Sequence, residues 1–194
     1  MNKKNMRSIY YSLLTMLLIT SCMDKEIRSL SLSDKETLSE FKELPMENIC
    51  VIAGADEPGQ PLLLCLTLFN KETLKPLSGQ RISFYHTSTE GTYDPVVSDD
   101  ESTARLNGSG VTDSLGRIFV RTILPGDYGS SNDNRHIHTS VFDAHPSAYD
   151  IHFKQYSGIM GRRFIDGSKQ HFLADLVSDN NQNLVTFLDM YIEF

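Results

Sequence analysis

A run of nine mostly apolar residues, Pro61 to Phe69 (PLLLCLTLF), most constrains the fold of this chain. The run is long enough for a β-strand that is buried on both faces. Two polar turn segments follow it, Asn70–Thr73 and Pro76–Gly79. The next segment, Arg81–His86, alternates in polarity and predicts a second strand. From about Ile49 onward, the pattern therefore indicates β-structure.

Short strand-like segments separated by turns rich in glycine and proline continue to the end of the sequence. Asp113–Gly116 has turn chemistry and predicts a hairpin between Gly110–Thr112 and Arg117–Thr122. Further strands are expected at His136–Phe142, Ala148–Phe153 and Leu184–Ile192. Because helical periodicity is scarce, residues 47–194 are predicted to form an all-β fold, a β-sandwich.

Residues 1–22 have the pattern of an export signal. A positively charged start precedes a short apolar run, Ser12–Ile19, which is too short to span a membrane. The ending Ile19–Cys22 resembles the lipobox of bacterial lipoproteins, which implies cleavage before Cys22 and lipid on its thiol. The alternative is a plain secretory signal with a coincidental cysteine. The expected location is the cell envelope, lipid-anchored outside the cytoplasm, with the outer membrane or cell surface favoured.

Residues 23–46 alternate charged residues with isolated leucines and are read as a tether between the anchor and the sandwich. A short helix is the alternative. Ser33–Glu36 could cap it, and Leu38, Phe41 and Leu44 would share one side.

The charge of the chain excludes one class of partner. The 25 acidic and 18 basic residues give a net charge of −7, and removal of residues 1–22, with three basic and no acidic residues, takes it to −10. Nucleic-acid binding requires a basic face, so this role is not expected. The acidic excess also disfavours adhesion to anionic lipid, which leaves the lipid anchor to hold the protein at a membrane.

The remaining cysteines, Cys50 and Cys65, permit a disulfide in an exported protein. Because Cys65 lies inside an apolar run, two small buried thiols are slightly preferred. The oligomeric state is left open.

Two tyrosines and two histidines form a candidate metal site. Tyr93 and Tyr128 each follow turn residues, and His136 and His138 are separated by one residue. On a strand, residues i and i+2 point to the same face, so both imidazoles can approach one ion. Phenolates and neutral imidazoles suit a hard, highly charged transition metal, and Fe(III) is the natural candidate.

These residues occur in an order that resembles the intradiol ring-cleavage dioxygenases. The resemblance covers roughly residues 60–142, and the segment Leu173–Tyr191 looks like the final strand pair of that family. A His-x-His motif alone is weak evidence for this family. Two tyrosines that follow matching turns, at the expected positions relative to the histidines, are specific evidence. The motifs that carry the resemblance are Pro76–Ile82, Phe84–His86, Glu90–Tyr93, Thr112–Arg117, Thr122–Tyr128 and His136–His138.

The resemblance implies a non-haem Fe(III) centre held by Tyr93, Tyr128, His136 and His138 in a β-sandwich. Family members open catechol-type rings between the two hydroxylated carbons and insert both atoms of O2. The implied partners are a small aromatic diol and O2. One tyrosine of the family acts as the base when substrate binds, and by position this is Tyr128.

The sequence departs from the family pattern beside the histidines. The family places an arginine three residues before the first histidine, where this chain has Asp133; the nearest arginine is Arg135. As a strand neighbour of His136, Arg135 is expected to point to the opposite face. A shift in the short loop could still bring it to the ring, so Arg135 is kept as a candidate catalytic residue. The Thr-Gln-aromatic segment of the family is echoed by Lys154–Tyr156, which makes Gln155 a candidate beside the substrate.

The departures keep two other interpretations open. One is a non-catalytic extracytoplasmic binding lipoprotein that retains the sandwich and the metal; the other is a purely structural lipoprotein in which the ligand set is a coincidence. Outside this site, His86 is read as structural, and His145, His152 and His171 have no evident partners in the sequence.

Overall fold

The computed structural model describes residues 26–127, 134–158, 163 and 165–194. Cys22, Tyr128 and Asp133 therefore lie outside the described residues. Within the described part of the chain, no helix combines the length and the apolar character needed to cross a membrane.

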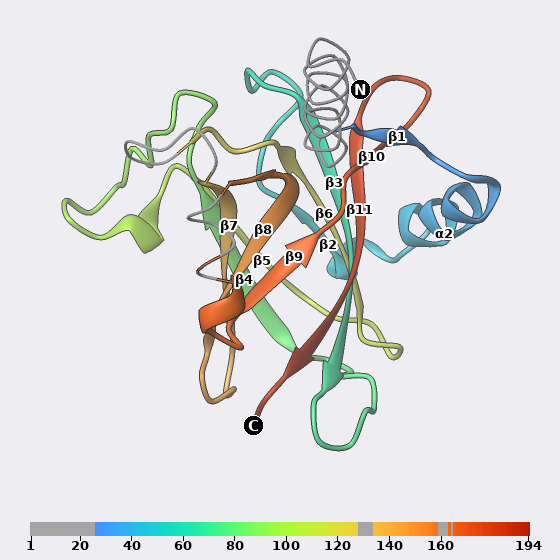
Figure 1. Ribbon diagram of the computed structural model, residues 1–194. Coiled ribbons are helices and arrows are strands. Elements are labelled where there is room, and N and C mark those ends of the chain that lie inside the picture. Colours follow the sequence, from blue (N-terminus) through green and yellow to red (C-terminus); the bar gives the residue numbers. More distant parts are fainter. Residues whose placement is uncertain (1–25, 128–133, 159–162, 164) are drawn as a thin grey trace, which may run out of the picture.

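Two β-sheets pack face to face, as the sequence predicted, and Figure 1 shows the two layers with the helix α2 beside one of them. The six-stranded sheet has the order β1-β10-β11-β3-β6-β2, and the five-stranded sheet has the order β5-β4-β7-β8-β9. The strands are β1 (Arg28–Ser29), β2 (Ile49–Val51), β3 (Pro61–Asn70), β4 (Arg81–His86), β5 (Leu106–Val111), β6 (Arg117–Ile123), β7 (Asn134–Val141), β8 (Ala148–Ser157), β9 (His171–Ala174), β10 (Val177–Ser178) and β11 (Leu184–Ile192). Two 3-10 helices, Met46–Asn48 and Glu101–Thr103, lie in the connections.

The apolar run of the sequence analysis is β3, and it lies between β6 and β11. Its alternate leucines, such as Leu64 and Leu66, are fully buried in the core between the sheets. There they pack with residues of the opposite sheet, including Phe84 and Ile137. Cys65 points to the other side of β3 and is buried as well. The strand is therefore buried on both faces, as predicted.

Helix α2 (Leu32–Lys42) covers the outer face of the six-stranded sheet. Ser31 begins the helix with a capping box: its hydroxyl accepts from the backbone N–H of Asp34, and the Asp34 carboxylate accepts from the backbone N–H of Ser31. Leu38 and Phe41 are buried against Phe119 and neighbouring residues of the sheet. The described part of the segment read as a tether thus contains the short strand β1 and a packed helix, whose apolar side completes a second, smaller core.

The predicted hairpin around Asp113–Gly116 is wrong. The turn forms, with a backbone hydrogen bond of 2.9 Å from Asp113 N–H to the carbonyl of Arg117. However, β5 pairs with β4, whereas β6 pairs with β2 and β3, so the turn connects the two sheets. On β5, a Cβ added to Gly110 would lie 2.8 Å from Ile118 of the facing sheet. The two segments therefore lie across the core from each other. The residues of the turn alone do not distinguish a connection between the two sheets from a hairpin within one sheet.

Cys50 and Cys65 are both free and buried, which agrees with the interpretation preferred from the sequence. Burial raises the pKa of the Cys50 thiol to about 11 and, with a smaller opposing effect of Lys42, that of Cys65 to about 12. Both side chains therefore act as small apolar groups.

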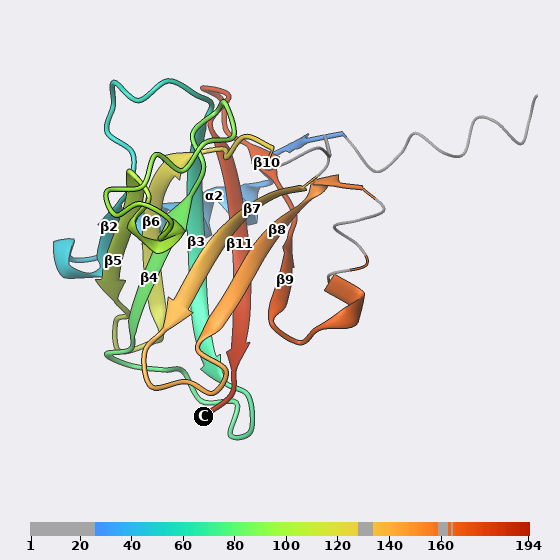
Figure 2. The same cartoon turned by 90° about the vertical axis from the view of Figure 1, so that its left-hand side faces the viewer.

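The five-stranded sheet carries the candidate site. In Figure 2, β7 and β8 run side by side in front of β3 and β11. The residues of β7 that point inward, Ile137 and Val141, belong to the core between the sheets. His136 and His138 alternate with them and so lie on the outer face of this sheet.

Candidate metal centre

The register of three adjacent strands gathers polar side chains around the two histidines of β7. His138 stands opposite Tyr85 of β4 and opposite Asp150 of β8, and His136 stands opposite His152 of β8. The Tyr85 ring stacks on the His138 ring with centroids 4.6 Å apart. Directly opposed residues on adjacent strands are close enough to interact, so the sheet itself assembles the site.

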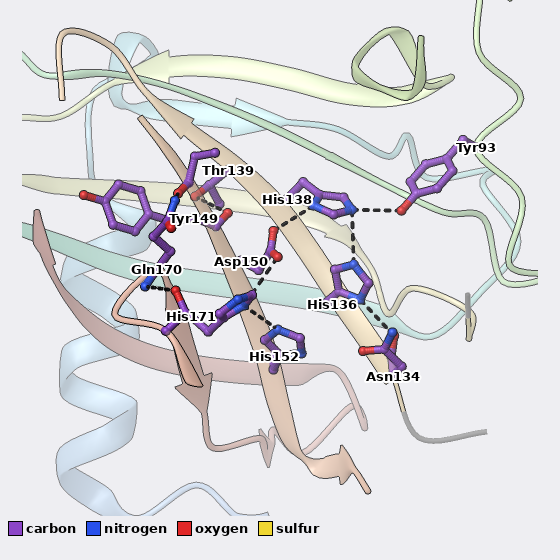
Figure 3. Close-up of polar contacts among 12 residues, drawn as sticks. Tyr93, Asn134, His136, His138, Thr139, Tyr149, Asp150, His152, Gln170 and His171 are labelled. Carbon is purple, nitrogen blue, oxygen red and sulfur yellow. Dashed lines mark hydrogen bonds and ion pairs between the residues drawn. The ribbon is translucent and has the colours of Figure 1, made fainter. Parts of the chain in front are cut away.

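Tyr93 reaches the histidines from the loop between β4 and β5. Its side chain is buried, and its hydroxyl lies 2.9 Å from Nε2 of His138 (Figure 3). A tight turn precedes it, with a 2.7 Å hydrogen bond from Ser88 N–H to the Thr92 carbonyl. Gly91, in the turn, has φ of 82°, and a Cβ there would collide with the backbone of Asp127. Only glycine fits this approach, which places Tyr93 over the sheet.

Two backing hydrogen bonds orient the imidazoles. Nδ1 of His136 lies 2.9 Å from the Asn134 carbonyl oxygen, and Nδ1 of His138 lies 2.7 Å from Oδ1 of Asp150. A carbonyl and a carboxylate only accept hydrogen bonds, so we assign the proton of each neutral ring to Nδ1. Both Nε2 atoms are then unprotonated.

The two Nε2 atoms face each other at a distance of 3.1 Å. Their lone pairs repel, and the single hydroxyl proton of Tyr93 can pair with only one of them. A cation that the two nitrogens and the Tyr93 oxygen bind together removes this conflict. The donor set, two imidazoles and a phenol oxygen, fits the Fe(III) ion predicted from the sequence.

Burial favours the neutral form of His136 that a metal requires. Burial, and secondarily the neighbouring His138, lowers the pKa of His136 below its ordinary value. A neutral imidazole is the form that ligates metals. Because its pKa is lowered, the His136 ring stays neutral, and able to bind a metal, down to a lower pH.

A second group, Asp150, His152 and His171, adjoins the first. Its ligand atoms lie within 4.8 Å of one another, with Nε2 of His152 3.1 Å from Nδ1 of His171 (Figure 3). Burial lowers the pKa of His152 to about 4. Burial alone would raise the pKa of Asp150, but the hydrogen bond from His138 and the nearby imidazoles hold it below its ordinary value.

This second group was not predicted from the sequence. Asp150 and His152 lie two residues apart on a predicted strand, so their common face could have been inferred. Their position opposite His138 and His136 depends on the β7–β8 register, which the sequence does not give. His171 lies on β9, which follows β8 after a long connection and pairs with it in parallel.

Two other predicted side chains have partners of their own. Arg135 lies with Nε 3.4 Å from Oδ2 of Asp127 and its guanidinium 4.5 Å from the centre of the Tyr156 ring. His86 is fully buried, with its ring nitrogens 2.7 Å from the Thr87 carbonyl and 2.6 Å from the Thr122 hydroxyl. The structural role predicted for His86 is confirmed.

Gln155 is not beside the histidines, and that prediction is corrected. Its side chain is buried, and its amide nitrogen donates to Asp175 at 2.7 Å and to the Leu176 carbonyl at 3.1 Å. Its amide oxygen accepts from the Leu176 N–H. Gln155 lies an odd number of residues from Asp150 and His152 on β8, so it points to the inward face of the strand rather than to the face of the histidines. The residue that stacks on His136 is His152, with ring centroids 5.2 Å apart.

Comparison with known proteins gives concordant matches. Residues 40–193 match a family model described as dioxygenase. A segment of 77 residues is 36% identical to catechol 1,2-dioxygenase of Acinetobacter baylyi, and it covers 39% of this chain and 24% of that enzyme. The matched segment is thus about a quarter of the length of that relative.

Solved structures share the fold. The dioxygenase domain of a dioxygenase–carbohydrate-binding fusion from Streptomyces sp. SirexAA-E superposes with a TM-score of 0.56 at 23% identity, covering 74% of this chain and 86% of that one. An intradiol ring-cleavage dioxygenase from Tetranychus urticae gives a TM-score of 0.54 at 20% identity, covering 74% and 85%. Catechol 1,2-dioxygenase from Acinetobacter sp. ADP1 gives a TM-score of 0.54 at 20% identity, covering 75% and 57%.

Proposed function

This chain belongs to the intradiol ring-cleavage dioxygenase family, and we propose that it is an Fe(III) enzyme that cleaves a catechol-type ring between its hydroxylated carbons with O2. The observation that carries the proposal is that Nε2 of His138 lies 3.1 Å from Nε2 of His136 and 2.9 Å from the Tyr93 hydroxyl. The catechol dioxygenases among its relatives supply the substrate class.

Tyr93, His136 and His138 would hold the iron, and the family resemblance adds Tyr128 as a fourth ligand. Bound there, Fe(III) supplies Lewis-acid chemistry that prepares the diol for reaction with O2. The Asn134 carbonyl and the Asp150 carboxylate keep both Nε2 atoms unprotonated and directed to the same place. The same resemblance gives Tyr128 the role of accepting a proton from the incoming diol.

A specific observation supports a second candidate, a binding protein that retains the metal without turnover. Arg135, the arginine nearest the histidines in sequence, is paired with Asp127 and lies over Tyr156. Gln155 is hydrogen-bonded elsewhere. Both side chains are thus engaged by other partners, which favours a role without turnover, and the assay below separates the two candidates.

We expect the iron-loaded protein to convert catechol under 18O2 to a ring-opened dicarboxylic acid that carries both labelled oxygen atoms. The reaction breaks the bond between the hydroxylated carbons and adds one O2 to one diol. Mass spectrometry of the product and oxygen uptake measure it, with protein stripped of iron as the control. A protein that binds catechol and iron but leaves catechol and its ring-substituted relatives intact would establish the binding role instead.

A further inference from the structure

The two histidines of the candidate centre are backed by unequal partners. His136 donates from Nδ1 to a neutral backbone carbonyl, whereas His138 donates to the charged carboxylate of Asp150 at the shorter distance of 2.7 Å. Hydrogen bonds to an ionised acceptor are roughly twice as strong as neutral ones. The imidazoles are therefore electronically distinct, although they come from the same strand.

We propose that Asp150 is a positioning residue that fixes His138 and, through its charge, strengthens the donor character of that ring toward the metal. The inference rests on the proposed iron site. A carboxylate that accepts the Nδ1 proton draws it away from the ring and makes the opposite nitrogen, Nε2, more basic. A more basic ligand stabilises the higher oxidation state of the metal, so Asp150 favours the ferric form.

The surrounding strands hold the Asp150 carboxylate in place. Asp150 stands opposite His138 on one side and pairs with His171 of β9 on the other. Its second oxygen, Oδ2, lies 3.4 Å from Nδ1 of His171. The carboxylate is thus fixed between imidazoles from two neighbouring strands. This arrangement also links β9 to the metal site.

The position of Asp150 agrees with such a role. It contacts His138 at the nitrogen that faces away from the converging donor atoms, so it acts through the ligand rather than on the metal or the substrate. The side chain is about one quarter exposed, which limits the screening of its charge by solvent. An asparagine would keep the shape and one acceptor oxygen but would lose the charge.

The test is the Asp150→Asn variant of the full chain, with ferric salt as the probe. We expect iron affinity to fall about 10–100-fold, the visible absorption band of the loaded protein to shift, and the reduction potential to rise. His171→Gln should change the band in the same direction by less. Asp175→Asn is the matched control, because this carboxylate contacts Gln155 and Lys154 and touches none of the histidines of the site.

An Asp150→Asn protein with the affinity, band and potential of the wild type would overturn the inference. So would an equal effect of Asp175→Asn, since the loss would then be general. A wild-type protein that binds no iron would refute the proposed function itself, and the inference with it. A band that is present in the wild type and unchanged in Asp150→Asn refutes only the role of Asp150.

Discussion

Replacing His138 with alanine is expected to abolish iron binding under conditions that load the wild-type protein. His138 holds the middle of the site: Nε2 faces both His136 and Tyr93, and Nδ1 faces Asp150. Structural zinc sites with four protein ligands bind with roughly 10–16 kcal/mol, or about 3 kcal/mol per ligand; by analogy, the loss of one ligand here should weaken iron binding by about 100-fold or more. Ring cleavage should fall to the level of the iron-free protein.

The matched control is His145→Ala, which removes an exposed histidine on the loop between β7 and β8. It should bind iron and turn over like the wild type. Iron content by elemental analysis and catechol turnover measure both variants, and circular dichroism checks that each is folded. Full iron content in His138→Ala would place the metal away from β7 and contradict the site.

Replacing Gly126 with alanine is expected to lower the free energy of unfolding by about 3 kcal/mol or more and to remove iron binding as well. A Cβ at this position would lie within 2.7 Å of three backbone atoms of the turn Ser88–Gly91. Backbone atoms cannot move aside as a flexible side chain can, so the cost lies at or above the usual 1–3 kcal/mol for overpacking. The same turn places Tyr93, and its displacement would disturb the site.

Gly54→Ala is the control for this variant. Its added Cβ would meet no atom within 4 Å, so we expect a change within about 0.5 kcal/mol. Urea denaturation gives the free energies, and iron titration gives the effect on the site. Equal stability of the two variants would show that the contact between Gly126 and the turn does not constrain Tyr93.

The strands and the histidine pair could be predicted because they depend on local patterns. The apolar run Pro61–Phe69 matches the observed strand β3 to within one residue. The alternating segment Arg81–His86 matches the observed strand β4. The i, i+2 spacing places His136 and His138 on one face without knowledge of the neighbours. Tyr93 became a candidate because it follows turn residues, and the family resemblance then gave it the role of a ligand; the structure brings it within 2.9 Å of His138.

The remaining parts of the site depend on pairing between strands. Asp150 and His152 acquire their roles only through the β7–β8 register. Gln155 was misjudged because the short Lys154–Tyr156 segment does not reveal which face of β8 it occupies. The hairpin error has the same origin: the chemistry of the turn after β5 is local, but the choice of sheet follows from which residues meet across the core. Helix α2 was underrated because its packing partners, such as Phe119, lie far along the chain.

The visible absorption spectrum after reconstitution with ferric salt tests the central claim most directly. A phenolate bound to ferric iron absorbs visible light, so the protein should become coloured with one iron per chain. Tyr93→Phe should shift or weaken the band, and so should Tyr128→Phe if the fourth ligand is as the family resemblance implies. A protein that stays colourless and retains no iron would contradict a ferric centre built on Tyr93, His136 and His138.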